Sequence, residues 1–180
     1  PGGRRMMQAW RNDEVGARFG AAAGLYEAHA PIQRLAAERL ASDINLLPLP
    51  PHPRILEIGC GTGLLTRALA RRIGPADWTV TDIAPGMLAA ARQGTALPGI
   101  ARYQLLDGEH PAGLPGGYDL ICSSLAVQWF ADLNAGLGRL AALLAPGGCL
   151  AVATLAAGTF QEWQAAHAAA GFAAATPPYP

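Results

Sequence analysis

The sequence predicts an α/β fold, a doubly wound and mostly parallel sheet with helices on both faces. Short apolar runs alternate with amphipathic segments along most of the chain, and a glycine-rich stretch, 59–63, joins the first apolar run to the helix that follows it. Alternating strands and helices predict right-handed βαβ units and therefore parallel strands. Ligands of such sheets bind beyond the carboxyl ends of the strands, where the glycine-rich stretch lies.

Apolar residues at spacings of three and four predict the helices, and short apolar runs predict the strands. After a basic tail, 1–12, two helices are expected at 14–29 and 31–44, the second beginning with Pro31, which fits a first helical turn. The proline-rich segment 48–53 then ends the helical part. The elements expected after it are strand 54–58, helix 64–73, strand 78–82, helix 85–93, strand 101–106, strand 118–123, helix 132–145, strand 149–154 and helix 160–170.

The composition indicates a folded domain without a charge bias. Hydrophobic residues make up 51% of the chain and charged residues 14%, which allows a sizeable core. Thirteen basic residues balance thirteen acidic ones, so nothing global favours nucleic acid or a membrane surface. The chain has no apolar run long enough to span a bilayer and opens with no signal peptide, so a cytoplasmic protein is expected. The cysteines, Cys60, Cys122 and Cys149, lack metal-site or disulfide spacing, and no metal is predicted.

The glycine-rich stretch indicates a site for a nucleotide-like cofactor. Glu57 precedes three alternating glycines, Gly59, Gly61 and Gly63, which allow a tight turn and bring backbone N–H groups close to a ligand. A dinucleotide site has its third glycine five positions after the first, where this chain has Leu64. That difference makes a nicotinamide-dependent oxidoreductase the weakest alternative. Glycine-rich turns also occur without ligands, so the motif alone leaves the question open.

Two acids at strand ends extend this site. Asp82 ends the second strand, where a carboxylate can accept hydrogen bonds from both ribose hydroxyls of a cofactor or can instead cap the next helix. Asp107 follows the third strand and can accept from an adenine amino group. Ile83 and Met87 can pack on the adenine faces, although helical core is the plain alternative for Met87.

These features, in this order, resemble class I S-adenosylmethionine-dependent methyltransferases over residues 54–155. The matching features are E-x-G-x-G-x-G, Asp82, D-G-E at 107–109, Y-D-L-I at 118–121 and L-x-P-G-G at 144–148. The resemblance implies a Rossmann-like sheet and S-adenosyl-L-methionine as the cofactor. It implies cofactor contacts from Glu57, Gly59, Cys60, Gly61, Gly63, Asp82, Ile83, Met87, Asp107, Gly108 and Ser123.

A finer resemblance, to malonyl-ACP O-methyltransferases of biotin synthesis, lies in segments 19–27, 124–129 and 154–163. It implies transfer of a methyl group to the free carboxylate of a malonyl group carried on acyl carrier protein. Tyr26, Gln128 and Trp129 become candidates for the pocket, with packing as the alternative for the two aromatic residues. A carboxylate is already ionised at pH 7 and needs no general base. No histidine is assigned a catalytic role, which covers His29, His52, His110 and His167.

The resemblance also predicts where the chain departs from the family. Its members have seven strands, and no sequence for strands six and seven follows the fifth strand here, so a truncated form is expected. An unpaired edge strand is normally avoided. The expected regions are 1–50, an N-terminal tail and helical cap, and 51–180, the cofactor-binding core.

Two alternatives to the malonyl-ACP hypothesis remain open, and the oligomeric state is not predicted. One is a methyltransferase for another small carboxylic acid or small molecule, and the other is a cofactor-binding module without catalysis. Acyl carrier protein is acidic, so its docking surface should be basic. The candidates for that surface are Arg4, Arg5, Arg11, Arg71 and Arg72.

Overall fold

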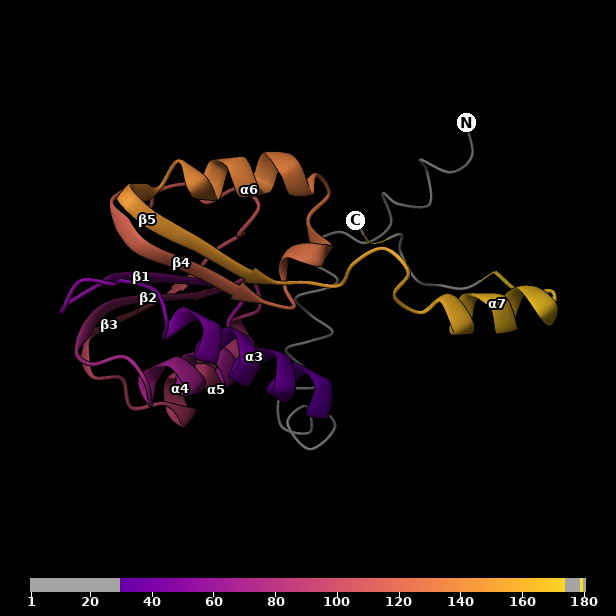
Figure 1. The fold of residues 1–180 in the computed structure, drawn as a ribbon, viewed down its shortest axis with the longest axis horizontal. Helices are drawn as coiled ribbons and strands as arrows, with labels where there is room; N and C mark the ends of the chain where they lie inside the picture. The colour runs from indigo at the N-terminus through magenta and orange to yellow at the C-terminus, as the bar shows by residue number, and fades with distance from the viewer. Residues whose placement is uncertain (1–29, 174–178, 180) are drawn as a thin grey trace.

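The computed structural model describes residues 30–173 and residue 179, and a five-stranded sheet forms its centre. The strand order is β3-β2-β1-β4-β5, and every pair of neighbours is parallel (Figure 1). The predicted doubly wound parallel α/β fold is therefore confirmed. The strands are β1 (Arg54–Ile58), β2 (Ala76–Asp82), β3 (Gly99–Leu105), β4 (Tyr118–Ser124) and β5 (Leu144–Ala153).

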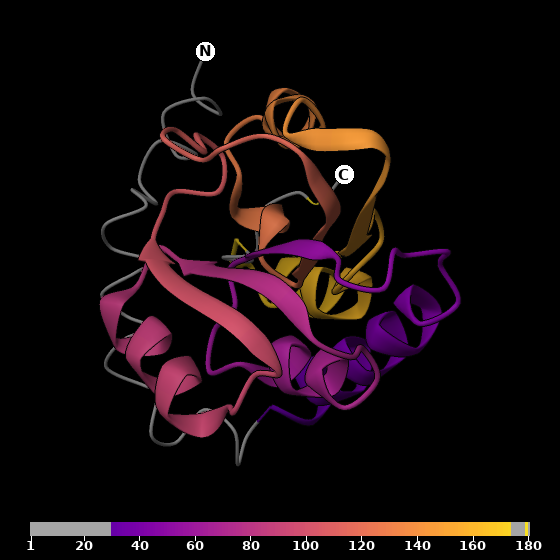
Figure 2. The same cartoon turned by 90° about the vertical axis from the view of Figure 1, so that its left-hand side faces the viewer.

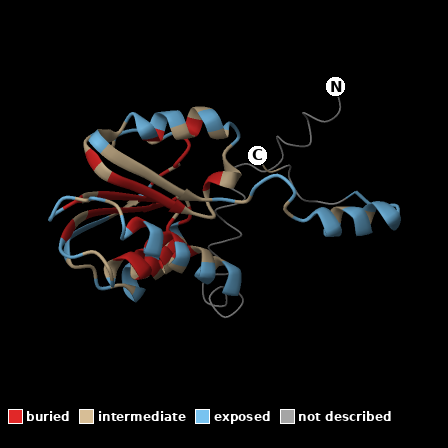
Figure 3. Cartoon of the chain, viewed as in Figure 1, coloured by how far each residue is buried: buried red, intermediate tan, exposed pale blue. Residues whose placement is uncertain are grey.

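Helices cover both faces of the sheet. On one face lie α3 (Pro31–Ile44), α4 (Leu64–Ala70) and α5 (Pro85–Gly94), and on the other lies α6 (Leu133–Ala141) (Figures 1 and 2). Successive strand residues point to opposite faces, and β1 shows this directly. Ile55 packs in the core beside α3 and α4, whereas Leu56 packs in the core that contains Leu140 of α6. Figure 3 shows the buried residues concentrated in the strands and on the helix faces that meet them.

The junction between α6 and β5 differs from the prediction. We expected a helix to Ala145 and a strand from Cys149, but α6 ends at Ala141 and β5 begins at Leu144. Tyr118 pairs with Leu144 while Leu120 pairs with Cys149, so the register shifts between the two pairs. A side chain at Gly148 would place its Cβ 2.6 Å from the carbonyl oxygen of Tyr118, which explains the glycine. The helix thus ends before the Pro-Gly-Gly sequence, because Leu144 already pairs with Tyr118 of β4 as part of a strand.

Smaller differences affect other boundaries. Helix α4 ends at Ala70 rather than at residue 73, and β2 begins at Ala76 rather than at residue 78. The start of β3 at Gly99 depends on close backbone contact, because a Cβ there would lie 2.2 Å from the carbonyl oxygen of Ala76. The predicted helix 14–29 lies outside the described residues.

The helix α7 (Gln161–Ala169) has no buried residue and lies away from the sheet, beyond the carboxyl end of β5 (Figures 1 and 3). Within the described part of the chain, β5 pairs only with β4 and thus forms one edge of the sheet, as β3 does at the other. Among the described helices, none is long and apolar enough to cross a membrane.

Candidate functional site

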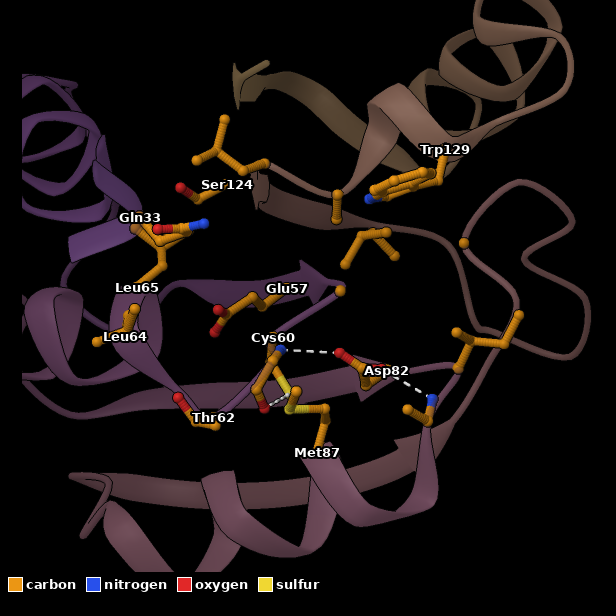
Figure 4. Close-up of a pocket in the computed structure, with 18 of the residues that line it drawn as sticks. Gln33, Glu57, Cys60, Thr62, Leu64, Leu65, Asp82, Met87, Ser124 and Trp129 are labelled. Carbon is orange, nitrogen blue, oxygen red and sulfur yellow. Dashed lines mark hydrogen bonds between the residues drawn. The ribbon is translucent and has the colours of Figure 1, made fainter. Parts of the chain in front are cut away.

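A pocket opens at the carboxyl ends of β1, β2 and β4, the position that the strand order predicts for a ligand (Figure 4). Its lining includes most of the residues singled out from the sequence. They are Glu57, Gly59, Cys60, Gly61, Asp82, Ile83, Met87, Asp107, Gly108 and Trp129. Residues that are far apart in the sequence are therefore brought together at one end of the sheet.

The three glycines of the loop after β1 have different roles. A Cβ at Gly59, where φ is +66°, would lie 2.3 Å from the Cβ of Ala126. Gly63, with φ of +89°, is the N-cap of α4, and a Cβ there would lie 3.3 Å from Ala91 of α5. Gly61 also has a positive φ, +54°, but nothing lies within 4 Å of its Cβ position. Two glycines therefore serve the packing of the loop, and Gly61 leaves its side of the pocket open to a ligand.

Asp82 connects this loop to the start of α5. Its Oδ2 accepts a hydrogen bond from the Gly61 N–H, and its Oδ1 accepts one from the Ala84 N–H, both at 2.8 Å. Ala84 is itself the N-cap of α5, so Asp82 does not cap that helix. Burial raises the pKa of the Asp82 carboxyl, while the hydrogen bonds from Ala84 and Gly61 lower it. Each carboxylate oxygen can accept a further hydrogen bond, so the group can still bind a ligand hydroxyl.

The segment after β3 forms the adjoining wall. Asp107 lines the pocket, and its Oδ1 accepts a hydrogen bond from the Glu109 N–H at 3.0 Å. Its Oδ2 lies 3.2 Å from the Nδ1 of His110. A Cβ at Gly108 would lie 2.3 Å from the Cγ2 of Ile58, so only glycine fits between β1 and this wall. Asp107 thus ends a segment that packs directly on the first strand.

Glu57 places a buried carboxyl group in the pocket wall. Its side chain is almost inaccessible to solvent, and its Oε2 has no hydrogen-bond partner among the described residues. Burial raises the pKa of this carboxyl to about 8, with nearby Thr66 lowering the pKa and the negative charge of Asp82 raising it. An unpaired buried polar atom is costly unless something satisfies it. A ligand that carries a hydrogen-bond donor or a positive charge would do so.

Several predicted site residues do not line the pocket. Ser123 is buried and its hydroxyl donates to the carbonyl oxygen of Ile58 at 2.9 Å, so the serine that lines the pocket is its neighbour Ser124. Gln128 instead secures a turn, because its Nε2 donates to the carbonyl oxygen of Leu125 at 2.9 Å. Gly63 caps α4, as described above, and Tyr26 lies outside the described residues.

Sequence reasoning also missed part of the lining. Gln33 reaches the pocket from α3, on the opposite side of the pocket from Trp129 (Figure 4). Leu125 has a φ of +53°, which is unusual for a residue with a side chain, and no sequence signal marks it. The other residues that were missed are Ala37, Ile58, Thr62, Leu64, Leu65, Ala84, Leu106, Ser124, Ala126 and Phe130. Most are apolar residues of a kind found throughout any core.

Other chemistry in the described residues is limited. No group of three His, Cys, Asp or Glu side chains there is placed to hold a metal ion. The pocket cysteine, Cys60, is free, and burial raises the pKa of its thiol well above the usual range, so the thiol is protonated at neutral pH. The described histidines His52, His110 and His167 do not line the pocket.

Two arginines considered for docking are paired within the molecule. Arg71 and Arg72 of the segment after α4 both bind Glu38 of α3, Arg72 at 2.9 Å. These pairs hold α3 beside α4 and reduce the positive charge that a partner would meet. The other candidates, Arg4, Arg5 and Arg11, lie outside the described residues.

Comparison with known proteins agrees with this geometry. Residues 56–150, more than half of the chain, match a family model described as a methyltransferase domain. The chain belongs to this family. The chain is 67% identical, over 166 residues, to the biotin biosynthesis bifunctional protein BioCD of Bordetella avium (strain 197N). It is also 43% identical, over 171 residues, to the malonyl-[acyl-carrier protein] O-methyltransferase of Magnetococcus marinus (strain ATCC BAA-1437 / JCM 17883 / MC-1).

The aligned regions cover 92% and 94% of this chain but only 35% and 63% of those two relatives. Among solved structures, one similar fold is phosphoethanolamine N-methyltransferase 1 of Haemonchus contortus in complex with phosphoethanolamine and S-adenosylhomocysteine. Its TM-score is 0.62 at 19% identity, over 78% of this chain and 31% of that one. At that identity the likeness concerns the fold alone.

Proposed function

We propose that this methyltransferase domain binds S-adenosyl-L-methionine in the pocket at the carboxyl ends of β1, β2 and β4. The observation that carries the proposal is the combination of open space at Gly61 with the unpaired buried oxygen of Glu57. The open space at Gly61 admits a ligand close to the backbone. The unpaired oxygen of Glu57 would be satisfied by a hydrogen-bond donor or a cation of that ligand. Glu57 lies near the carboxyl end of β1 and Gly61 on the loop that follows it, where such sheets bind their ligands.

The acceptor groups and apolar side chains of the pocket fit the chemical groups of this cofactor. Asp82 retains acceptor capacity for the ribose hydroxyls, and Asp107 would accept from the adenine amino group. Met87 and Ile83 offer apolar surface to the adenine ring. Glu57 would take the ammonium of the methionine part, because the pair would satisfy both buried groups. When bound, the cofactor supplies a methyl group on a positively charged sulfur.

We propose the carboxylate of a malonyl group on acyl carrier protein as the methyl acceptor. The support is the name of the relatives, malonyl-[acyl-carrier protein] O-methyltransferase, together with the absence of a histidine from the described lining of the pocket. A carboxylate is ionised at pH 7 and can act as a nucleophile without one. The protein would therefore contribute alignment of the reacting groups and exclusion of water. Trp129 and Phe130 form the apolar wall suited to that role.

The experiment that tests this proposal is a methyl-transfer assay on the 180-residue chain. Malonyl-ACP, malonyl-CoA and free malonate are incubated with the methyl donor, and mass spectrometry follows the acceptor. We expect methylation of the carrier-bound malonyl group, and its loss in Asp82→Asn. Methylation of free acids but not of malonyl-ACP would move the assignment to another small carboxylic acid. Cofactor binding with no transfer to any of the three would contradict the proposed catalytic role of this chain.

A further inference from the structure

One wall of the pocket is a single segment, residues 125–132, between β4 and α6. It contributes Leu125, Ala126, Trp129 and Phe130 to the lining and contains the short 3-10 helix η3 (Val127–Trp129). It carries no glycine and no acidic motif that would mark it as a binding loop. Its position must therefore be fixed by contacts with other parts of the chain.

The main contact at its C-terminal end is Glu109, a buried residue of the D-G-E motif that the cofactor assignment does not use. Its Oε2 accepts a hydrogen bond from the Ala131 N–H at 2.8 Å, and its Oε1 accepts one from the Asp132 N–H at 3.0 Å. The Glu109 carbonyl oxygen accepts from Nη1 of Arg139 in α6 at 2.8 Å. One side chain thus satisfies two consecutive backbone donors at the entry to α6.

Packing around Phe130 makes this position specific. A Cβ at Gly136 of α6 would lie 2.4 Å from the Phe130 ring, and a Cβ at Gly108 would lie 3.4 Å from it. The ring therefore fits between two glycines, one on α6 and one in the segment after β3. Glu109 is the neighbour of Gly108, so it joins the two pocket walls at the place where they meet.

A second contact secures the other end of the segment. The Leu125 N–H donates to the carbonyl oxygen of Ala153 at 2.8 Å, and the Leu125 carbonyl oxygen accepts from Gln128. Leu125 can keep its positive φ because these bonds hold it there. The segment is thus fastened to β5 at one end and to Glu109 at the other.

We propose that Glu109 is a positioning residue of the pocket, which fixes the segment that carries Trp129 and places Phe130 against Gly108. The proposal rests on the function proposed above and adds a residue to that site. A carboxylate is required because two adjacent N–H groups need two acceptor oxygens, and an amide supplies only one. Aspartate has the right charge but is one methylene shorter and does not reach both donors in the same way.

The test separates positioning from general stability. We would incorporate 5-fluorotryptophan into the 180-residue chain and record fluorine NMR spectra of wild type, Glu109→Gln and the matched control Glu162→Gln. Glu162 lies on the exposed helix α7, and Trp129→Phe assigns the Trp129 signal. Of the four tryptophans of the chain, Trp78 is fully buried in β2 and Trp163 lies on α7, so their signals are internal references, whereas Trp10 lies outside the described residues and its signal is not used.

We expect Glu109→Gln to shift or broaden the Trp129 signal while leaving Trp78 and Trp163 unchanged, and Glu162→Gln to leave the Trp129 and Trp78 signals unchanged. The kcat/KM for the methyl acceptor should fall about tenfold, the typical effect of losing one hydrogen bond to a charged group. The Kd for S-adenosylhomocysteine should rise by less than about threefold, because Gly61 and Asp82 are untouched. An unchanged Trp129 signal with kcat/KM within about twofold of wild type would overturn the proposal.

Two further readouts keep the proposal testable. If Glu109→Gln does not fold, hydrogen exchange of the wild-type chain decides. Slow exchange of the Ala131 and Asp132 amides supports their hydrogen bonds to Glu109, and exchange at the rate of an exposed loop contradicts them. If the wild type fails to bind S-adenosylhomocysteine, the proposed function is wrong, while the fluorine spectra still test the positioning of Trp129.

Discussion

The two walls of the pocket are built in different ways. The wall on β1 and β2 consists of a glycine loop and the acids Glu57 and Asp82. These residue types have few structural roles at such positions, so they indicate a binding site. The wall between β4 and α6 consists of apolar residues such as Trp129 and Phe130, which are held by a distant carboxylate and by an unusual backbone conformation at Leu125. The first wall provides chemical groups, and the second provides shape.

This difference explains what a substitution should do on each side. On the first wall, residues are constrained one by one through φ, burial or charge, so single changes act directly on folding or binding. On the second wall, the pocket residues depend on partners that do not line the pocket themselves, such as Glu109 and Gln128. Changes there should act through position rather than through lost ligand contacts.

The largest effect is expected from Gly59→Ala. The new Cβ would overlap the Cβ of Ala126 at 2.3 Å, and φ is +66°. Adding the cost of a left-handed residue to that of overpacking, we expect a loss of about 2–5 kcal/mol in the free energy of unfolding, measured by urea denaturation.

The matched control is Gly61→Ala, because that position has a similar φ but open space around it. It should cost only about 1–2 kcal/mol of stability, the cost of the conformation alone. It should nevertheless weaken S-adenosylhomocysteine binding, since Gly61 lines the pocket and a methyl group there would occupy open space. Equal stability losses in the two variants would contradict the different roles assigned to these glycines.

The next effect is the pH dependence of stability that Glu57 imposes. Burial raises its pKa from the ordinary value of 4.5 to about 8 in the folded chain. The folded state therefore binds more protons than the unfolded state between these two values, and stability falls as the pH rises through that window. The slope contributed by one such group reaches at most about 1.4 kcal/mol per pH unit.

Urea denaturation of wild type and Glu57→Gln at several values between pH 5 and pH 9 measures this slope. The variant should lose most of the slope, keeping the part that belongs to Asp82, whose pKa is also raised. Parallel curves for the two proteins would show that Glu57 is ionised in the folded state at neutral pH.

The smallest effect is expected from the two serines at the end of β4. Ser123→Ala removes a buried hydrogen bond to Ile58 and should cost about 1 kcal/mol of stability with unchanged ligand binding. Ser124→Ala should leave stability within about 0.5 kcal/mol of wild type, and any change should appear in the Kd or the KM. The opposite pattern would show that Ser123 faces the pocket.

These serines also show how far the sequence could lead. Alternating strands and helices predicted the sheet, and a glycine loop with acids at strand ends predicted the first wall, because few other residues suit those positions. The choice between Ser123 and Ser124 depends on which of the two hydrogen-bonds within the sheet and which lines the pocket. Sequence periodicity does not locate the end of a strand to within one residue.

Apart from Trp129, which the resemblance of segment 124–129 named, the second wall and the start of β5 could not be predicted from the sequence for a different reason. Both depend on contacts between residues far apart in the chain. Leu144 joins β4 through pairing with Tyr118, and Phe130 finds its place between Gly108 and Gly136. Gln33 reaches the pocket because α3 packs against α4, β4 and β5, which no local pattern indicates.

The most direct test of the central claim is a calorimetric titration of the 180-residue chain with S-adenosylhomocysteine, repeated with Asp82→Asn and Asp77→Asn. Both aspartates lie on β2, but Asp77 pairs with Arg102 away from the pocket. We expect saturable binding by wild type and Asp77→Asn, and affinity at least about tenfold weaker for Asp82→Asn. No binding by a folded wild-type chain, or equal affinity in all three proteins, would contradict it.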